Sequence, residues 1–296
     1  MPRQIAAFAL MSLIWGLTWA AIKIGLTVLP PVLLAALRYL ATTALLLPIV
    51  GPRTGAFTPD KRWRTVASAI LINVGTYPLM FWGMQSVSSG LAGLVNLALI
   101  PVLLFGLAAL TGEERAGWRH ALALGIGCVG LVGLFWTRLT EGSGGSALGL
   151  GAIVVGTACY CLGSIVARPL VGQVSPLRLT LAQAALGGVV LLALSFAIEP
   201  LSGATWAALA SPQAIGSVLF LSLAGTVIGF SVYLMLMREW GTARAGLYAF
   251  VSPIVALISG FIMFGEHIGL AEIGGSALML IAAAIAMRRR KAPASA

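Results

Sequence analysis

Two cations lie inside long apolar runs of this sequence. Lys23 is five residues from the end of the first run, and Arg38 is seven residues into the second. A charge at the centre of a bilayer costs about 2.5–3.5 kcal/mol on insertion scales, so residues of this kind are commonly functional. Either cation could bind a carboxylate-bearing substrate. Because both side chains are long, either could instead extend to the nearer membrane interface.

Carboxylates are missing from the centres of the same runs. All eight acidic residues, and the histidines His120 and His267, fall in connections or at run ends. Proton-driven carriers commonly use a carboxylate inside the membrane as a proton relay. The pattern therefore favours facilitated movement of a solute down its gradient, with proton-coupled antiport as the alternative. Glu114 and Glu266, each at the end of a run, are expected to bind loop amides or arginines.

Polar and aromatic residues near the run centres form a second group of candidates. Several lie four residues apart, which places them on one face of a helix. Such side chains suit a cavity that binds small zwitterions or aromatic compounds through hydrogen bonds, stacking and cation–π contacts. The alternative is hydrogen bonding between helices. The substrate-binding candidates are Trp15, Trp19, Lys23, Arg38, Asn73, Tyr77, Asn96, Tyr160, Ser164, Ser231, Tyr233 and Tyr248.

Two prolines and a row of glycines bear on helix shape and packing. Pro101 and Pro253 lie in the middle of apolar runs and are predicted hinges, although a static kink would need the same residue. Gly127, Gly130 and Gly133 recur every three residues, which permits close helix packing. They could serve packing within the chain or the face of a homodimer, and the sequence leaves both open.

Ten apolar helices must position these side chains. The chain has 296 residues, of which 59% are hydrophobic and 9% are charged. Soluble domains carry about 25% charged residues, so a soluble fold is excluded, and a helix needs about 20 apolar residues to cross a bilayer. The predicted fold is an all-α polytopic membrane protein. Its predicted spans are 4–28, 31–50, 64–84, 90–111, 117–137, 147–167, 176–198, 212–237, 244–264 and 270–287.

The lysines and arginines predict the orientation of these helices. When the connections alternate between the two sides, fifteen of the 18 cations fall on one side and only Arg138 falls on the other. Cytoplasmic loops are enriched in Lys and Arg, so both termini are predicted to be cytoplasmic, in a multi-pass protein of the cell (bacterial inner) membrane. No cluster of cations and aromatics forms a soluble face, so nucleic acid is not an expected partner.

The two halves of the chain resemble each other. The segment 93–114 recurs at 246–266, with Pro101 and Pro253 separated by 152 residues. The first quarter recurs at an offset of 145, which pairs Trp15 with Tyr160, Lys23 with Arg168, Pro31 with Pro176 and Arg38 with Gln183. Five helices per half is an odd number, so the halves must be inverted, as in alternating-access transporters. The predicted repeats are 1–145 and 146–296, within one membrane domain.

These features resemble the drug/metabolite transporter (DMT) superfamily, EamA family, over essentially the whole chain. In each half, a mid-run proline is followed thirteen residues later by a glutamate, Glu114 or Glu266. The resemblance is carried by this doubled pattern, by Trp15-Gly16 and by the segment from Pro31 to Arg38. One departure is that Glu113 and Glu114 both could match Glu266. The resemblance implies a central cavity lined mainly by the first, third, fourth, sixth, eighth and ninth helices. It also implies export of amino acids, other metabolites or small drugs. Within the family, the chain looks similar to the YddG-type amino-acid exporters.

The sequence as a whole predicts a facilitative, alternating-access exporter of small metabolites, most of all amino acids. The expected partners are a small-molecule substrate and the lipid bilayer. The motifs HExxH, GxSxG, GxxxxGK[ST] and CxxC are absent, so we expect no enzyme activity, no cofactor and no metal. An intramembrane enzyme and a channel are the alternatives from other classes, and the inverted duplication favours the carrier over both.

Overall fold

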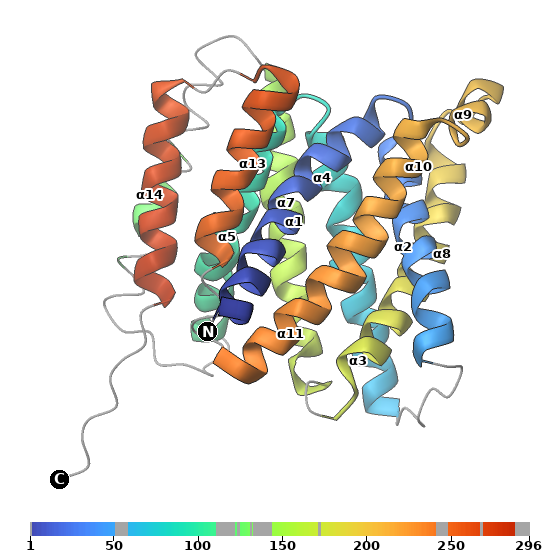
Figure 1. The fold of residues 1–296 in the computed structure, drawn as a ribbon, viewed down its shortest axis with the longest axis horizontal. Coiled ribbons are helices and arrows are strands. Elements are labelled where there is room, and N and C mark those ends of the chain that lie inside the picture. Colours follow the sequence, from blue (N-terminus) through green and yellow to red (C-terminus); the bar gives the residue numbers. More distant parts are fainter. Residues whose placement is uncertain are drawn as a thin grey trace.

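The computed structural model describes residues 2–50, 59–110, 122, 125–130, 132, 144–170, 173–240, 248–266 and 269–287. Every element in these ranges is a helix (Figure 1). Six helices are long and apolar enough to cross a membrane, and three shorter apolar helices accompany them among the described residues. The all-α polytopic fold is therefore confirmed. The count of ten stays a prediction, because the span expected at 117–137 lies largely outside the described residues.

The first half of the chain supplies four long helical stretches. Three of them are single helices: α1 (Pro2–Leu26), α2 (Pro31–Val50) and α5 (Ser89–Leu110). The other stretch, third in chain order, lies between α2 and α5. The third stretch is not uniform, because it runs through α3 (Pro59–Ala69), the π-helical segment η1 (Ile70–Gly75) and α4 (Tyr77–Gly83).

The second half repeats this plan. It contains α7 (Gly144–Ala167), the short 3₁₀ segment η2 (Arg168–Leu170), α8 (Pro176–Ile198), α9 (Gly203–Ala208), a broken stretch, α13 (Tyr248–Phe264) and α14 (Leu270–Met287). The broken stretch again has a π-helical middle, with α10 (Pro212–Leu219), η3 (Phe220–Ile228) and α11 (Gly229–Trp240). Short polar signals start several of these helices: the Ser175 and Ser211 side chains accept hydrogen bonds from the first turns of α8 and α10, and a proline follows each serine.

Counterpart helices of the two halves run antiparallel. The amides of Val32 and Leu33, in the first turn of α2, donate to Glu199 at the end of α8, at 2.7 and 2.9 Å. The amides of Ser89 and Gly90, at the start of α5, donate to Glu266 just after α13, at 2.8 and 3.0 Å. Since α2 corresponds to α8 and α5 to α13 in the sequence repeat, the head-to-tail contacts show the relation that inverted halves require.

The helices define two faces of the molecule. We call the face where α1 begins, α2 ends and α8 begins the N-terminal face, and the face where α1 ends and α2 and α5 begin the opposite face (Figure 1). The buried apolar core fills the level next to the opposite face, with Leu29, Leu33, Met84, Val87 and Leu91 at most 4% exposed. Large apolar side chains elsewhere point outward, as lipid contact requires, among them Leu148, Val189 and Ile262.

Candidate functional site

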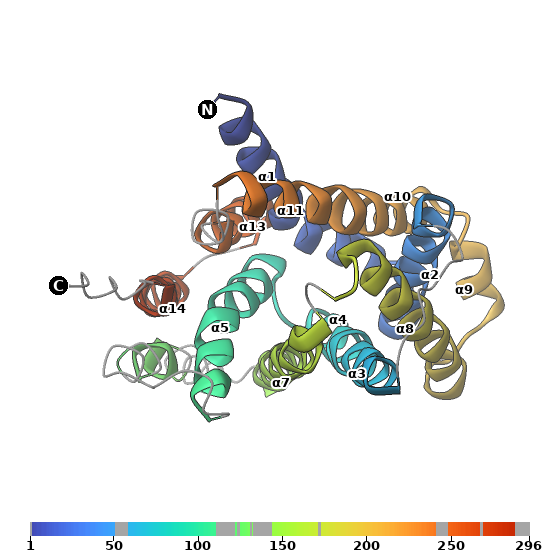
Figure 2. The ribbon, with the colours of Figure 1, turned by 90° about the horizontal axis from the view of Figure 1, so that it is seen from below.

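A cavity of about 400 Å³ lies in the middle of the molecule. Its lining comes from both halves: α1, α2, η1, α4 and α5 from the first, and α7, α8, η3, α11 and α13 from the second. Seen along the helices, these elements surround the centre, while α14 lies at the periphery (Figure 2). The volume is within the range of about 300–1,000 Å³ that is typical of small-molecule sites.

The cavity reaches toward the N-terminal face, and toward the opposite face it ends at Ile22 and Met80, which belong to the buried apolar core. Its lining includes Ala167 at the end of α7 and Leu179 and Thr180 in the beginning of α8. On the other side, its first lining residues in α2 and α5 are Arg38 and Asn96, each seven residues into its helix. The apolar core fills the space beyond them, so the described structure has a cavity closed toward the opposite face.

Arg38 is the only cation among the described lining residues. Its side chain lies with the guanidinium carbon 4.8 Å from the Tyr77 ring centre and 5.5 Å from that of Tyr39. One terminal nitrogen is 3.4 Å from the Thr226 hydroxyl, and Nε has no hydrogen-bond partner among the described residues. The residue is only 9% exposed. A buried guanidinium with free donors is suited to bind an anionic group.

An aromatic cluster borders the cavity on the side of α11 and α13. The Trp15 ring is 4.5 Å from that of Tyr248 and 5.5 Å from that of Tyr233, and the two tyrosines are 5.6 Å apart. The indole nitrogen of Trp15 donates to the carbonyl of Gly225 at 2.9 Å. That carbonyl lies in the π-helical segment η3, so the irregular backbone of the second half of the chain holds the tryptophan of the first half in place.

Two amide side chains of the lining are already engaged between helices. Asn73 donates to the carbonyl of Gln183 at 2.7 Å, and Asn96 donates to the Thr157 hydroxyl at 2.9 Å. Gln183 in turn donates to the Ser68 hydroxyl at 2.8 Å. Hydrogen bonding between helices, the alternative considered from the sequence, is therefore present at Asn73 and Asn96, although both also line the cavity.

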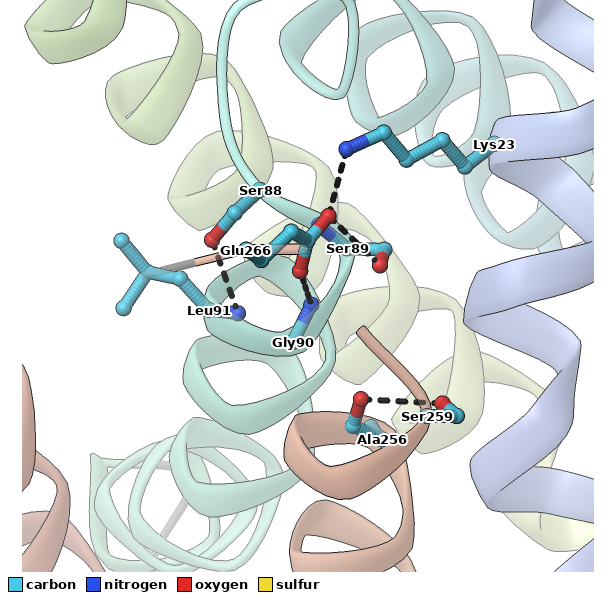
Figure 3. Close-up of polar contacts among 8 residues, drawn as sticks. All are labelled: Lys23, Ser88, Ser89, Gly90, Leu91, Ala256, Ser259 and Glu266. Atoms are coloured by element: carbon cyan, nitrogen blue, oxygen red, sulfur yellow. Dashed lines mark hydrogen bonds and ion pairs between the residues drawn. The ribbon is translucent and has the colours of Figure 1, made fainter. Parts of the chain in front are cut away.

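Lys23 and Glu266 form an ion pair at the opposite face. The Lys23 ammonium is 2.5 Å from Glu266 Oε1 and 4.7 Å from the Phe264 ring centre. Glu266 also accepts from the amides of Ser89 and Gly90 and from the Ser89 hydroxyl, so one carboxylate joins α1, α5 and the end of α13 (Figure 3). Burial raises the pKa of Glu266, but Lys23 and the two amides outweigh it, and the pKa is lowered overall.

Glu266 thus binds amides and a cation at a helix end, as expected, but the amides belong to the first turn of α5 and not to a loop, and the cation is Lys23 and not an arginine. Its counterparts in the first half, Glu113 and Glu114, lie outside the described residues, as do His120, His267, Arg138 and Gly133. Gly127 packs within the chain, because a Cβ there would be 3.5–3.6 Å from Ala282 and Val102. That contact accounts for one glycine of the row and leaves the homodimer a prediction.

The structure brings together most of the residues that were predicted to form the substrate site. Lys23 and Tyr233 are not in the lining, and Ser231 is exposed, with its hydroxyl bonded to the Val227 carbonyl. Substrate contact itself stays a prediction for all twelve. Those in the lining are Trp15, Trp19, Arg38, Asn73, Tyr77, Asn96, Tyr160, Ser164 and Tyr248.

Sequence reasoning missed several residues of the lining. Helices α2 and α8, the second and seventh predicted spans, line the cavity in addition to the helices implied by the resemblance. Gln183 in α8 could have been found as the repeat counterpart of Arg38. Thr76 and Thr226 could have been found in the same way, because they are counterparts in the two halves, 150 residues apart. Thr18, Tyr39 and Phe230 are further residues of the lining that were missed.

An all-helical membrane protein with a metabolite-sized cavity between antiparallel halves has the form of a polytopic transporter. The chain matches the EamA-like transporter family twice, over residues 3–136 and 147–288. It belongs to that family, and it is a membrane transporter.

Known relatives agree with this membership. The chain is 26% identical to an uncharacterized transporter of Archaeoglobus fulgidus over 95% of this chain and 98% of that one. It is 29% identical to the uncharacterized inner membrane transporter YedA of Escherichia coli, over 92% and 86% of the two chains. A crystal structure with 19% identity superposes with a TM-score of 0.62 over 96% and 97% of the chains, which supports the fold. Similarity to YddG-type exporters within the family stays a prediction.

Proposed function

We propose that this protein exports small metabolites, with amino acids as the expected class, by facilitated alternating access. The observation that carries the proposal is the central cavity, which both halves line and which the apolar core of the described residues closes toward the opposite face. A site at the interface of inverted repeats can be presented to either side when the halves rock against each other. A pore would not need an apolar core that closes the cavity toward the opposite face.

The direction of access follows from the distribution of charge. The cations of the sequence are concentrated on the side to which the N-terminal face belongs, which favours a cytoplasmic position for that face in the bacterial inner membrane. The cavity would then be open to the cytoplasm, as loading of an exporter requires. Release to the outside needs the apolar core to part and the contacts of Glu266 with Lys23 and the start of α5 to break.

The cavity lining, as far as the structure describes it, has no free acid, which favours facilitated transport over proton antiport. Among the described residues, the lining contains no carboxylate. Glu199 is engaged with the amides of α2, and Glu266 with those of α5 and with Lys23. Direction would accordingly be set by the substrate gradient alone.

Uptake of radiolabelled amino acids into proteoliposomes, with and without an imposed pH gradient, tests this function. We expect saturable uptake of several amino acids at rates indifferent to the pH gradient, in excess of uptake into protein-free liposomes. A requirement for the proton gradient would contradict the facilitated mechanism. Uptake that rises linearly with concentration, without competition between substrates, would indicate a channel instead.

A further inference from the structure

The guanidinium of Arg38 has more donors than the protein satisfies. Arginine carries five N–H groups and no acceptor. The described residues offer one distant hydroxyl, that of Thr226 at 3.4 Å, and the faces of Tyr39 and Tyr77, while Nε has no partner. The side chain is 9% exposed and belongs to the cavity lining, so a solute in the cavity would meet a guanidinium that the protein satisfies only in part.

No carboxylate among the described residues forms an ion pair with Arg38. Each described acid whose contacts are known is engaged elsewhere: Asp60 with Arg64, Glu239 with Gln4, Glu199 with the start of α2, and Glu266 with Lys23. No carboxylate is among the described lining residues. In a site of low dielectric constant, an unpaired cation attracts a solute that brings one negative charge and repels one that brings a positive charge.

A zwitterion satisfies this site incompletely. Its carboxylate would bind Arg38, but its ammonium group would lie a few ångströms away in a cavity whose described lining has no acid to receive it. Aromatic faces such as that of Trp15 could give a cation–π contact, which is weaker than an ion pair at a buried site. The site would keep a net charge of about one after a zwitterion binds and none after a monoanion binds.

We propose that the cavity selects monoanionic carboxylates with an aromatic or apolar body over zwitterionic amino acids of the same shape, with Arg38 as the specificity-determining residue. The rings of Tyr39, Tyr77 and Tyr160 line the same space and suit such a body. This inference rests on the proposed transport function and moves its preferred substrates from amino acids to monoanionic carboxylates.

L-3-phenyllactate and L-phenylalanine form a matched pair for the test, because a hydroxyl replaces the ammonium group with little change of shape. Radiolabelled uptake of both compounds into proteoliposomes is measured at neutral pH, with a valinomycin-imposed potassium potential of either sign. We expect kcat/KM for phenyllactate to exceed that for phenylalanine by about tenfold or more. An inside-positive potential should accelerate phenyllactate uptake, because a carried anion moves charge whereas leakage of the neutral acid does not.

Arg38→Gln should lower phenyllactate uptake by about tenfold or more and abolish the preference over phenylalanine. Arg178→Gln makes the same chemical change at an exposed position at the start of α8 and should leave both rates unchanged. Arg38→Lys keeps the charge without the planar fork, so it should retain the preference for the anion at reduced affinity. Monodisperse elution and an unaltered Tm in detergent verify that each variant is folded.

Three results would overturn the inference: phenylalanine carried as well as phenyllactate, phenyllactate uptake insensitive to potential, or a preference that survives in Arg38→Gln. Each of them leaves the proposed transport of amino acids standing. Failure of saturable uptake for every amino acid and for phenyllactate would instead refute the transport function on which the inference rests.

Discussion

The carboxylate of Glu266 accepts hydrogen bonds from three sources at once: the ammonium of Lys23, the amides of Ser89 and Gly90, and the Ser89 hydroxyl. Glu199 makes the corresponding contact with the start of α2, but its side-chain donor is the neutral hydroxyl of Ser195 at 2.6 Å. Both carboxylates lie at the positive end of a helix, which they stabilise. Only the Glu266 contact includes an ion pair with a third helix.

Glu266→Gln and Lys23→Gln test whether the ion pair closes the opposite face. Each substitution should lower Tm by a few degrees, since loss of a helix N-terminal cap costs about 0.5–2 kcal/mol and a partly exposed pair contributes less. Because the two side chains act on one contact, the double variant should be no less stable than Glu266→Gln alone. Thermal unfolding in detergent measures this, with Glu199→Gln as a cap variant that has no cation partner. Additive effects of the two substitutions would contradict the coupling.

The lowered pKa of Glu266 has a definite consequence for stability against pH. A carboxyl whose pKa is lower in the folded than in the unfolded state contributes stability above its ordinary value of 4.5, and that contribution is lost as the pH falls through the lowered pKa. We therefore expect Tm to be independent of this group from about pH 6 to 8, and the difference between wild type and Glu266→Gln to shrink only in more acidic solution. A difference that shrinks between pH 8 and 6 would contradict this assignment.

At the scale of the helix, the two π-helical segments are the irregular elements that line the cavity. The hydroxyl of Thr76, directly after η1, donates to the carbonyl of Leu71 at 3.0 Å, and in η3 the Thr226 hydroxyl donates to that of Leu221, also at 3.0 Å. Each hydroxyl satisfies a carbonyl five residues earlier, and both threonines line the cavity. π-helical turns inside α-helices are frequent at functional sites.

Thr76→Val removes this hydroxyl without changing the size of the side chain. A net loss of about 1 kcal/mol per hydrogen bond is expected, so substrate uptake should fall several-fold while the protein still folds. Thr226→Val should reduce uptake further, because Thr226 is also the acceptor for Arg38. Uptake kinetics in proteoliposomes provide the measurement. Unchanged kinetics in both variants would mean that the π-helical segments have no part in transport.

Close helix packing places a second constraint on the elements. A Cβ on Gly83 of α4 would collide with the carbonyl oxygen of Gly149 in α7, and a backbone atom cannot move aside cheaply. Gly83→Ala should therefore lower Tm by several degrees, in keeping with the cost of about 1–3 kcal/mol for overpacking. Gly203→Ala in α9, where a Cβ would meet nothing within 4 Å, is the matched control. Equal Tm values for the two variants would argue against the tight α4–α7 contact.

Seen as a whole molecule, the fold could be predicted further than the site. Pro31 and Pro176 mark the starts of α2 and α8 in the sequence, and the same repeat implies the antiparallel arrangement that the contacts of Glu199 and Glu266 display. Hydropathy needs only local sequence, and the duplication needs only a comparison of the chain with itself. Broken helices escaped prediction, because an apolar stretch such as 220–228 looks the same whether its turns are α-helical or π-helical.

The two cations illustrate where prediction of the site ended. Lys23 and Arg38 have similar depth in their runs, so the sequence ranked them equally. Their environments differ because of a residue 243 positions away: Glu266 pairs with Lys23, whereas Arg38 lies in the cavity without a carboxylate. Such a contact depends on how helices pack in three dimensions. Pro101 and Pro253 lie within the α5 and α13 helices, and their role as hinges stays a prediction.

Substrate counterflow tests the central claim, alternating access through this cavity, most directly. Proteoliposomes loaded with an unlabelled substrate are diluted into a trace of the labelled compound, and the label inside is followed with time. An alternating-access carrier should show a transient accumulation of label above the outside concentration, several-fold faster than in empty vesicles, and Arg38→Gln should reduce it. If the labelled compound inside only reaches the outside concentration, at a rate that does not depend on preloading, the result would contradict alternating access and would indicate a pore.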